Sequence, residues 1–132
     1  MKLSALAVAT ALFSGAVFAA PLTLQTYNPQ EKGLFAVNST LVSGPHEAVL
    51  FDAQFSVKDG EKLVEMIRKN GKPLSRIVIT SGDPDFYFGL EPLVKSLPRR
   101  RRWSPRRRSS KHIAATKAAK LAYWGPQMKD AR

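Results

Sequence analysis

"EAVLFDAQFSVKDGEKLVEMIRKNGKPLSRIVITSG", residues 47–82, carries the pattern that decides the fold. Two short apolar runs, residues 47–53 and 76–82, flank a segment in which hydrophobic side chains recur at helical spacing. Ser56 suits the N-cap of that helix, and Gly71 suits the position just after its end. The order strand, helix, strand predicts a βαβ unit with parallel strands and a right-handed crossover.

The rest of the chain extends this unit on both sides. Upstream, residues 22–27 and 34–44 alternate or group apolar residues in a way that predicts two more strands. Downstream, a loop leads to a predicted helix over about residues 88–96, and the Ala-rich residues 111–123 predict a second helix that ends before Gly125. The expected fold class is therefore α/β.

The first residues have the pattern of a secretory signal peptide. Lys2 precedes an apolar run over residues 3–18, and this run is too short and too rich in small residues for a comfortable membrane span. We expect residues 1–19 to be removed after Ala19, which would make the protein periplasmic or secreted, with no transmembrane segment left. An uncleaved anchor is the alternative. The chain has no cysteine, so disulfides cannot support the exported fold.

The positive charge is concentrated near the end of the chain. The net charge is +11, yet residues 1–98 carry nine Lys or Arg and nine Asp or Glu. Residues 99–132 carry twelve basic residues against Asp130 alone. A basic protein of this kind normally suggests nucleic acid or an anionic surface as the partner. Here the charge describes one segment and not the whole fold.

The loop after the second strand of the βαβ unit carries the main functional signal. The stretch "VITSGDPDFYFGLEPL", residues 78–93, resembles the first metal-binding loop of the metallo-β-lactamase superfamily, in which a strand ends in Thr-His-x-His-x-Asp-His. The resemblance covers residues 22–97 and resumes over residues 112–127. It implies the first half of an αββα sandwich, with residues 20–98 as its amino-terminal half and residues 111–132 as a helix and tail. It also implies zinc-dependent hydrolysis of an ester, amide or similar bond in a small-molecule substrate.

The resemblance also shows where the metal ligands of the family would fall. The first His of the motif falls on Ser81, the second on Asp83, the Asp on Asp85 and the last His on Phe86. Zinc of this class relies on imidazole nitrogen, which Phe86 lacks and Ser81 replaces with a weak neutral oxygen. Asp85, with Asp83, remains as a metal candidate, and with Ser81 the pair could hold Ca²⁺ or Mg²⁺. We interpret the two aspartates instead as turn and N-cap residues.

The histidines of the chain lie elsewhere. His46 stands in a predicted turn and His112 in the predicted second helix, so we expect both to be solvent-exposed surface residues. The family takes its further ligands from its second half, which would lie beyond Arg132. We therefore expect a truncated protein that binds no zinc and is inactive, with no catalytic residue beyond the family position of Asp85.

The stretch "LPRRRRWSPRRRSSK", residues 97–111, allows three interpretations. It could be a solvated basic loop, or a segment translated out of frame. It could also make the chain a basic secreted protein that binds nucleic acid or another polyanion, with Trp103 available for stacking. That alternative function would use seven guanidinium groups: Arg99, Arg100, Arg101, Arg102, Arg106, Arg107 and Arg108.

We favour the out-of-frame interpretation for residues 99–110. The resemblance requires an apolar strand at this point, and buried arginines without partners would be prohibitively unfavourable. If the codons are CGN for Arg, TCN for Ser and TGG for Trp, reading from the third base of each codon gives small residues around Val, Leu or Met. Such a peptide suits a strand and a turn, and two compensating slips in the gene would produce the observed segment.

The nucleotide sequence tests this interpretation. We expect CGN codons for the arginines of residues 99–108 and a TCN codon for Ser104. AGA or AGG codons for the arginines, or AGT or AGC for Ser104, would contradict it.

Overall fold

A computed structural model of the protein describes residues 20–96, 102–103 and 107–128, so the expected signal peptide lies outside the described residues. None of the helices in these ranges is both long enough and apolar enough to span a bilayer. The elements follow one another as β1 (Thr23–Tyr27), β2 (Ser39–Ser43), β3 (Ala48–Phe51), α1 (Val57–Asn70), β4 (Leu74–Val78), α2 (Leu90–Ser96), β5 (Arg102–Trp103) and α3 (Arg107–Trp124), with single 3₁₀ turns η1 (Gln30–Lys32) and η2 (Pro84–Phe86).

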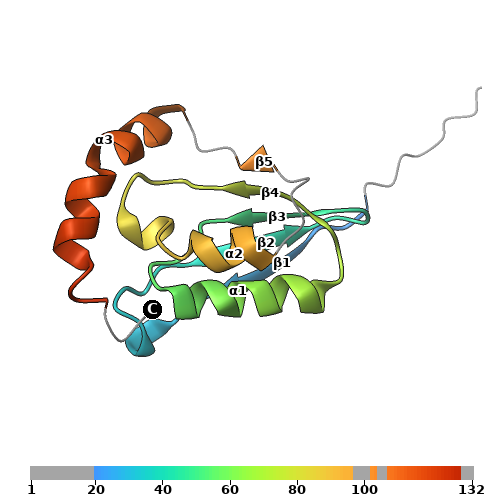
Figure 1. Cartoon of the computed structure of the whole chain (residues 1–132). Coiled ribbons are helices and arrows are strands. Elements are labelled where there is room, and N and C mark those ends of the chain that lie inside the picture. The colour runs from blue at the N-terminus through green and yellow to red at the C-terminus, as the bar shows by residue number, and fades with distance from the viewer. Residues whose placement is uncertain (1–19, 97–101, 104–106, 129–132) are drawn as a thin grey trace, which may run out of the picture.

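The strands form one mixed sheet in the order β1-β2-β3-β4-β5. The first three strands are antiparallel neighbours, whereas β3, β4 and β5 run parallel. Helix α1 connects β3 to β4, so the predicted βαβ unit and the predicted α/β class are confirmed (Figure 1).

The predicted ends of α1 are confirmed as well. The Ser56 hydroxyl accepts a hydrogen bond from the Asp59 N–H at 3.0 Å, and Gly71 adopts the left-handed conformation with φ of 73°. Helix α1 lies close to α2 and to the residue before it. A Cβ added at Gly60 would lie 2.7 Å from Pro92 Cγ and 2.2 Å from the Gly89 carbonyl oxygen. A side chain at Gly60 is therefore incompatible with the observed approach of the two helices.

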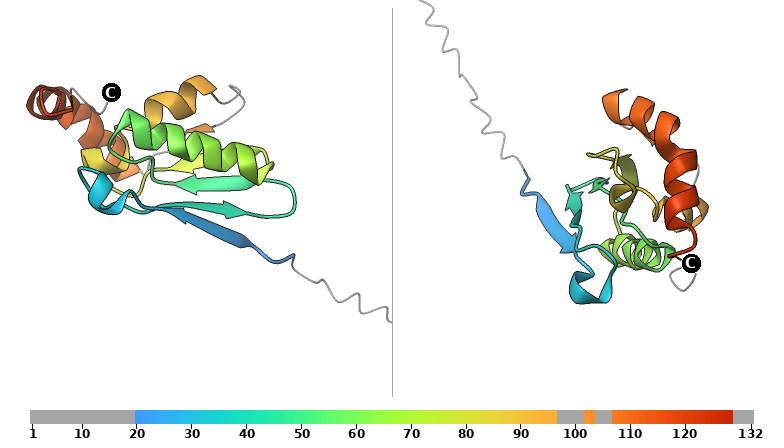
Figure 2. Two further views of the ribbon diagram at one scale, coloured as in Figure 1. Left: turned by 90° about the horizontal axis from the view of Figure 1, so that it is seen from below. Right: turned by 90° about the vertical axis from the view of Figure 1, so that its left-hand side faces the viewer.

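The helices α1 and α2 cover one face of the sheet, and α3 runs across the end at which β3 and β4 finish (Figures 1 and 2). The covered face and the two helices share a core in which six aliphatic side chains are almost fully buried: Leu41, Leu50, Leu63, Leu74, Ile79 and Leu93. Burial of this apolar surface is the main source of stability in a chain without disulfides.

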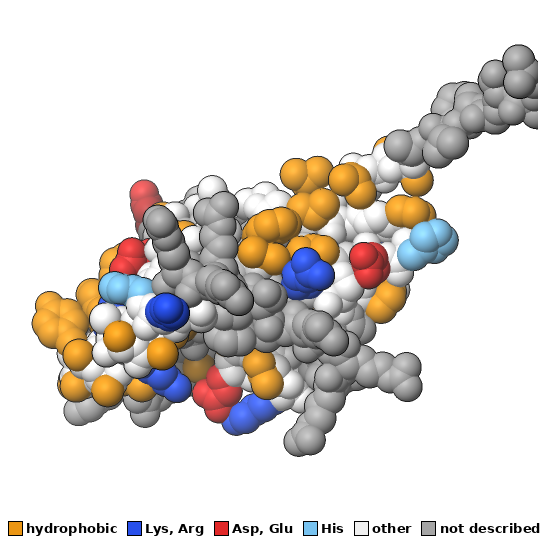
Figure 3. Space-filling view, turned by 90° about the horizontal axis from the view of Figure 1, so that it is seen from above, with side chains coloured by type: hydrophobic (Ala, Val, Ile, Leu, Met, Phe, Trp, Pro, Cys, Tyr) orange, Lys and Arg blue, Asp and Glu red, His pale blue; other side chains and the backbone are white. Residues whose placement is uncertain are grey.

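The other face of the sheet carries hydrophobic side chains without a covering layer in the described residues. Val42 is paired in register with Leu24 on one side and Val49 on the other, so the three share a face. Leu24 is 68% exposed, and Val42 and Val49 are partly exposed. Figure 3 shows hydrophobic side chains gathered at the surface along this side of the molecule.

Several boundaries differ from those predicted. The strand predicted over residues 34–44 begins only at Ser39, since η1 and an irregular segment precede it. The helix predicted from about residue 88 begins at Leu90, and the helix predicted over residues 111–123 begins at Arg107 and ends at Trp124. Ends of elements depend on tertiary contacts that hydrophobic periodicity does not record.

The Arg-rich segment contributes a short strand at the point where the resemblance requires an apolar one. Residues 102–103 form β5, in which Arg102 is paired with Arg76 and Trp103 with Ile77 of β4. An edge strand is held by main-chain hydrogen bonds, which any residue except proline can supply. The four arginines 99, 100, 101 and 106 lie outside the described residues.

The ends of β3 and β4 are joined by a side-chain contact. Asp52 follows β3 and adopts a positive φ of 62°. Its Oδ1 accepts a hydrogen bond from the Thr80 N–H at 2.7 Å, and its Oδ2 accepts one from the Thr80 hydroxyl at 2.7 Å. Burial raises the pKa of the Asp52 carboxyl above its usual 3.8, although the two bonds from Thr80 act in the opposite direction.

Replacing Asp52 tests how much this contact contributes to stability. Asp52→Ala leaves the Thr80 N–H without its partner and is expected to lower the free energy of unfolding by about 1–3 kcal/mol. Asp52→Asn can keep both contacts and tolerates the positive φ, so it should cost less. Chemical denaturation monitored by circular dichroism measures both values. The control Glu65→Ala, on the exposed side of α1, should change stability by less than about 0.5 kcal/mol.

The unmodified protein and Asp52→Asn also show how stability should depend on pH. Because the pKa of Asp52 is raised on folding, the folded chain retains this proton at a pH where the unfolded chain has lost it. The stability of the natural protein, relative to Asp52→Asn, should therefore fall as the pH rises from about 4 through the folded-state pKa. An increase of this relative stability with pH over the same range would contradict a raised pKa for Asp52.

Candidate functional site

The loop that follows β4 starts where Asp52 holds Thr80. The Ser81 hydroxyl donates a hydrogen bond to Asp83 Oδ2 at 3.2 Å and accepts one from the Asp83 N–H at 3.3 Å. Asp83 occupies the N-cap position of η2, but its side chain makes no capping bond there. The interpretation of Asp83 as a turn residue is thus correct, while its capping role is not observed.

The positions that the resemblance assigns to metal ligands are occupied by dissimilar groups. Asp85 lies within η2 and Phe86 packs against the hydrophobic core. Burial raises the pKa of the Asp85 carboxyl, and the negative charges of Asp83 and Asp52 add to this shift, while Lys120 opposes it. Asp83 and Asp85 are therefore close enough to influence each other, but the neighbouring positions supply no strong ligand.

A lysine from α3 enters this loop. Lys120 Nζ donates a hydrogen bond to the Gly82 carbonyl oxygen at 2.7 Å and lies 3.3 Å from Asp83 Oδ1. Its side chain is only 19% exposed. The ammonium group thus neutralises Asp83 and satisfies a main-chain carbonyl of the loop.

His112 accompanies Lys120 on the same helix. Its Nε2 lies 3.5 Å from Lys120 Nζ, and its ring packs so closely on Gly82 that an added Cβ would lie 2.5 Å from the ring carbon Cδ2. His112 is exposed, as expected, but it also contacts the loop. His46 lies exposed in the turn between β2 and β3, as predicted.

The sequence did not identify Lys120 as a contact of this loop, although its spacing from His112 was visible. Residues 112 and 120 are eight positions apart, which places them on nearly the same face of a helix. Nothing in the sequence indicates that this face meets a loop thirty-eight positions earlier in the chain.

Aromatic residues close the other side of the loop. The Trp124 ring lies edge-on to Phe55 at 5.4 Å between centroids and to Phe35 at 5.3 Å. These rings, with Asp83, Asp85 and Lys120, line a cavity of about 310 Å³. The arrangement therefore presents carboxylate oxygens next to an ammonium and an apolar wall.

This donor set does not fit zinc. Zinc sites in proteins use several imidazole, thiolate or carboxylate ligands in tetrahedral geometry. Among the residues that the structure describes, no group of three His, Cys, Asp or Glu side chains could hold a metal ion. Lys120 adds a positive charge beside Asp83, which opposes binding of any cation, including Ca²⁺ or Mg²⁺.

No described contact links the Arg-rich segment to this site. Arg102 lies in β5, and Arg107 and Arg108 begin α3, but their side chains are outside the described part of the structure. The anion-binding alternative through residues 99–108 therefore stays a prediction.

Solved metallo-β-lactamases share this arrangement of strands and helices. DIM-1 metallo-β-lactamase aligns with a TM-score of 0.56 and 26% identity, over 73% of this chain and 42% of that chain. TMB-1 aligns with a TM-score of 0.53 and 22% identity, over 73% and 43% of the two chains. FIM-1 from Pseudomonas aeruginosa, solved in its mono-zinc form, aligns with a TM-score of 0.54 and 14% identity, over 73% and 42%.

No family model matches the sequence, and no curated protein matches it. The structural likeness extends over most of this chain but over less than half the length of the proteins to which it is similar. The resemblance noted in the loop sequence is therefore confirmed at the level of the fold. This chain is a metallo-β-lactamase-fold protein that spans about two fifths of the length of its solved neighbours.

Proposed function

We propose that the chain is an exported metallo-β-lactamase-fold protein that does not catalyse zinc-dependent hydrolysis. The observation that carries this proposal is the position of Lys120, whose ammonium contacts Gly82 and Asp83 in the loop that resembles a metal-binding loop. The absence of imidazole at positions 81, 83 and 86 supports the same conclusion.

A small molecule is the preferred class of ligand or substrate for this fold. One solved neighbour, DIM-1 metallo-β-lactamase, has been studied after exposure to ceftazidime. In the part of the chain that is described, no contact favours nucleic acid or another polyanion over a small molecule. Polyanion binding through residues 99–108 stays a prediction, because the arginine side chains of this segment lie outside the described part of the structure.

Zinc binding separates the proposal from a working hydrolase. The purified protein, mixed with one equivalent of zinc and dialysed, should retain much less than one zinc per chain by elemental analysis. The triple variant Ser81→His, Asp83→His, Phe86→His supplies the missing imidazoles and should bind zinc at least tenfold more tightly. Adding Lys120→Met to this variant should strengthen binding further, because it removes a like charge.

Two controls make this result interpretable. Lys120→Met alone should not create a zinc site, since it adds no ligand, and circular dichroism should show that each variant remains folded. Stoichiometric zinc on the unmodified protein, together with ceftazidime hydrolysis that a chelator abolishes, would refute the proposal.

Export rests on the pattern of residues 1–19. Expression with this segment intact should yield a protein outside the cytoplasm whose mass corresponds to a chain beginning at Ala20. Mass spectrometry of the fractionated cells measures this directly. A cytoplasmic protein that retains Met1, or a membrane-bound protein that retains residues 1–19, would show that export or cleavage has been misassigned.

A further inference from the structure

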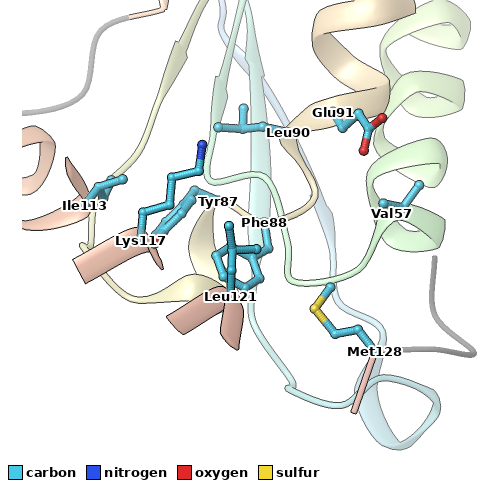
Figure 4. A pocket seen from close by; sticks show the side chains of 9 residues that line it. All are labelled: Val57, Tyr87, Phe88, Leu90, Glu91, Ile113, Lys117, Leu121 and Met128. Atoms are coloured by element: carbon cyan, nitrogen blue, oxygen red, sulfur yellow. The ribbon is translucent and has the colours of Figure 1, made fainter. Parts of the chain in front are cut away.

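A second, larger cavity lies beside the loop, between α3 and the segment that leads from η2 into α2 (Figure 4). Its volume is about 670 Å³, which is within the range of sites for small ligands. Tyr87, Phe88 and Leu90 form one wall, and Ile113 and Leu121 of α3 form the opposite wall. The cavity is thus a space between two apolar surfaces.

Three side chains of α3 line this space. They are Ile113, Lys117 and Leu121, whereas the five alanines of residues 114–122 are solvent-exposed and do not line the cavity. Leu121 lines the cavity yet remains 41% exposed, whereas Ile113 is buried against the core. The walls therefore expose apolar surface to water, and such surface often marks a binding site.

A positive charge at the cavity indicates that a ligand would be an anion. Lys117 projects from α3 past Tyr87 toward Leu90 (Figure 4). No ion pair joins Lys117 to any of the described residues, whereas Glu91, at the opposite rim, is paired with Lys95. The sequence of α3 contains no Asp or Glu, so the field of this helix favours an anion.

Tyr87 contributes its ring to the cavity lining. The residue is only 6% exposed, and its hydroxyl oxygen is inaccessible to solvent. The wall that Tyr87 forms is therefore apolar, and Lys117 supplies the positive charge at the cavity.

We propose that this cavity binds a small amphipathic anion, namely a molecule with an aromatic or branched apolar body and a single carboxylate or sulfonate group. The apolar body fills the space between Phe88 and Leu121, and the anionic group pairs with Lys117. The proposal does not depend on the absence of zinc from the neighbouring loop, because none of the candidate metal ligands lines this cavity.

Two fluorescent probes of similar shape and different charge test this assignment. The anionic probe is 8-anilinonaphthalene-1-sulfonate, and the neutral probe is N-phenyl-1-naphthylamine. Both should bind saturably, with one molecule per chain, in a buffer that contains a chelator. Lys117→Glu should weaken binding of the anionic probe at least tenfold and that of the neutral probe less than twofold.

A matched variant and a filled cavity complete the experiment. Lys111→Glu makes the same charge change on the same helix but outside the cavity lining, and it should alter binding of either probe less than twofold. Leu121→Trp should fill the cavity and weaken both probes. Thermal unfolding of each variant must show an unchanged midpoint, because partly unfolded chains also bind such dyes.

Three results would overturn the proposal. Unsaturable binding of the anionic probe would indicate general surface adsorption. Equal losses for Lys117→Glu and Lys111→Glu would indicate an effect of net charge alone. Unchanged binding of both probes to Leu121→Trp would place the site elsewhere. Because the chelator removes free metal, these outcomes are independent of the zinc experiment.

Discussion

The contact between Asp52 and Thr80 joins the two parallel strands at the place where the candidate site begins. A single carboxylate accepts one main-chain and one side-chain hydrogen bond from the same residue, each at 2.7 Å. Thr80 lies just after β4, so this contact holds the start of the loop that carries Ser81, Asp83 and Asp85 at the carboxyl end of that strand. Loops at the carboxyl ends of parallel strands are common positions for functional sites in α/β proteins.

The loop keeps a defined conformation with groups other than metal ligands. Ser81 and Asp83 bond to each other, and Lys120 bonds to Gly82 and Asp83 from the neighbouring helix. An ammonium on a flexible side chain can neutralise a carboxylate without the strict geometry that zinc demands. The metallo-β-lactamase fold can therefore hold this loop in place even where imidazole ligands are missing.

Two apolar surfaces lie apart from the compact core, in different parts of the fold. The face of the sheet that carries Leu24, Val42 and Val49 has no covering layer among the described residues. The cavity beside α3 instead lies between Ile113 and Leu121 of that helix and the segment that leads into α2. The first surface is a flat face of paired strands, whereas the second is a hollow between two packed segments.

The sequence by itself determined the βαβ unit, the two ends of α1 and the kinds of donor atom in the loop. These features depend on local periodicity, on single capping residues and on side-chain chemistry, none of which needs a three-dimensional contact to be known. Phe86 lacks a donor atom in any conformation. The absence of imidazole from these positions of the loop is therefore evident from the sequence alone.

Only the tertiary structure decided which side chains meet that loop. Lys120 and His112 reach Gly82 because α3 crosses the end of the sheet, and that crossing depends on packing between segments far apart in the chain. The side chains of Arg102 and Trp103 likewise did not predict that these residues join the sheet. Pairing at a sheet edge uses main-chain groups and does not depend on side-chain polarity. Local patterns specify elements, whereas the spaces and charges between elements depend on how those elements pack.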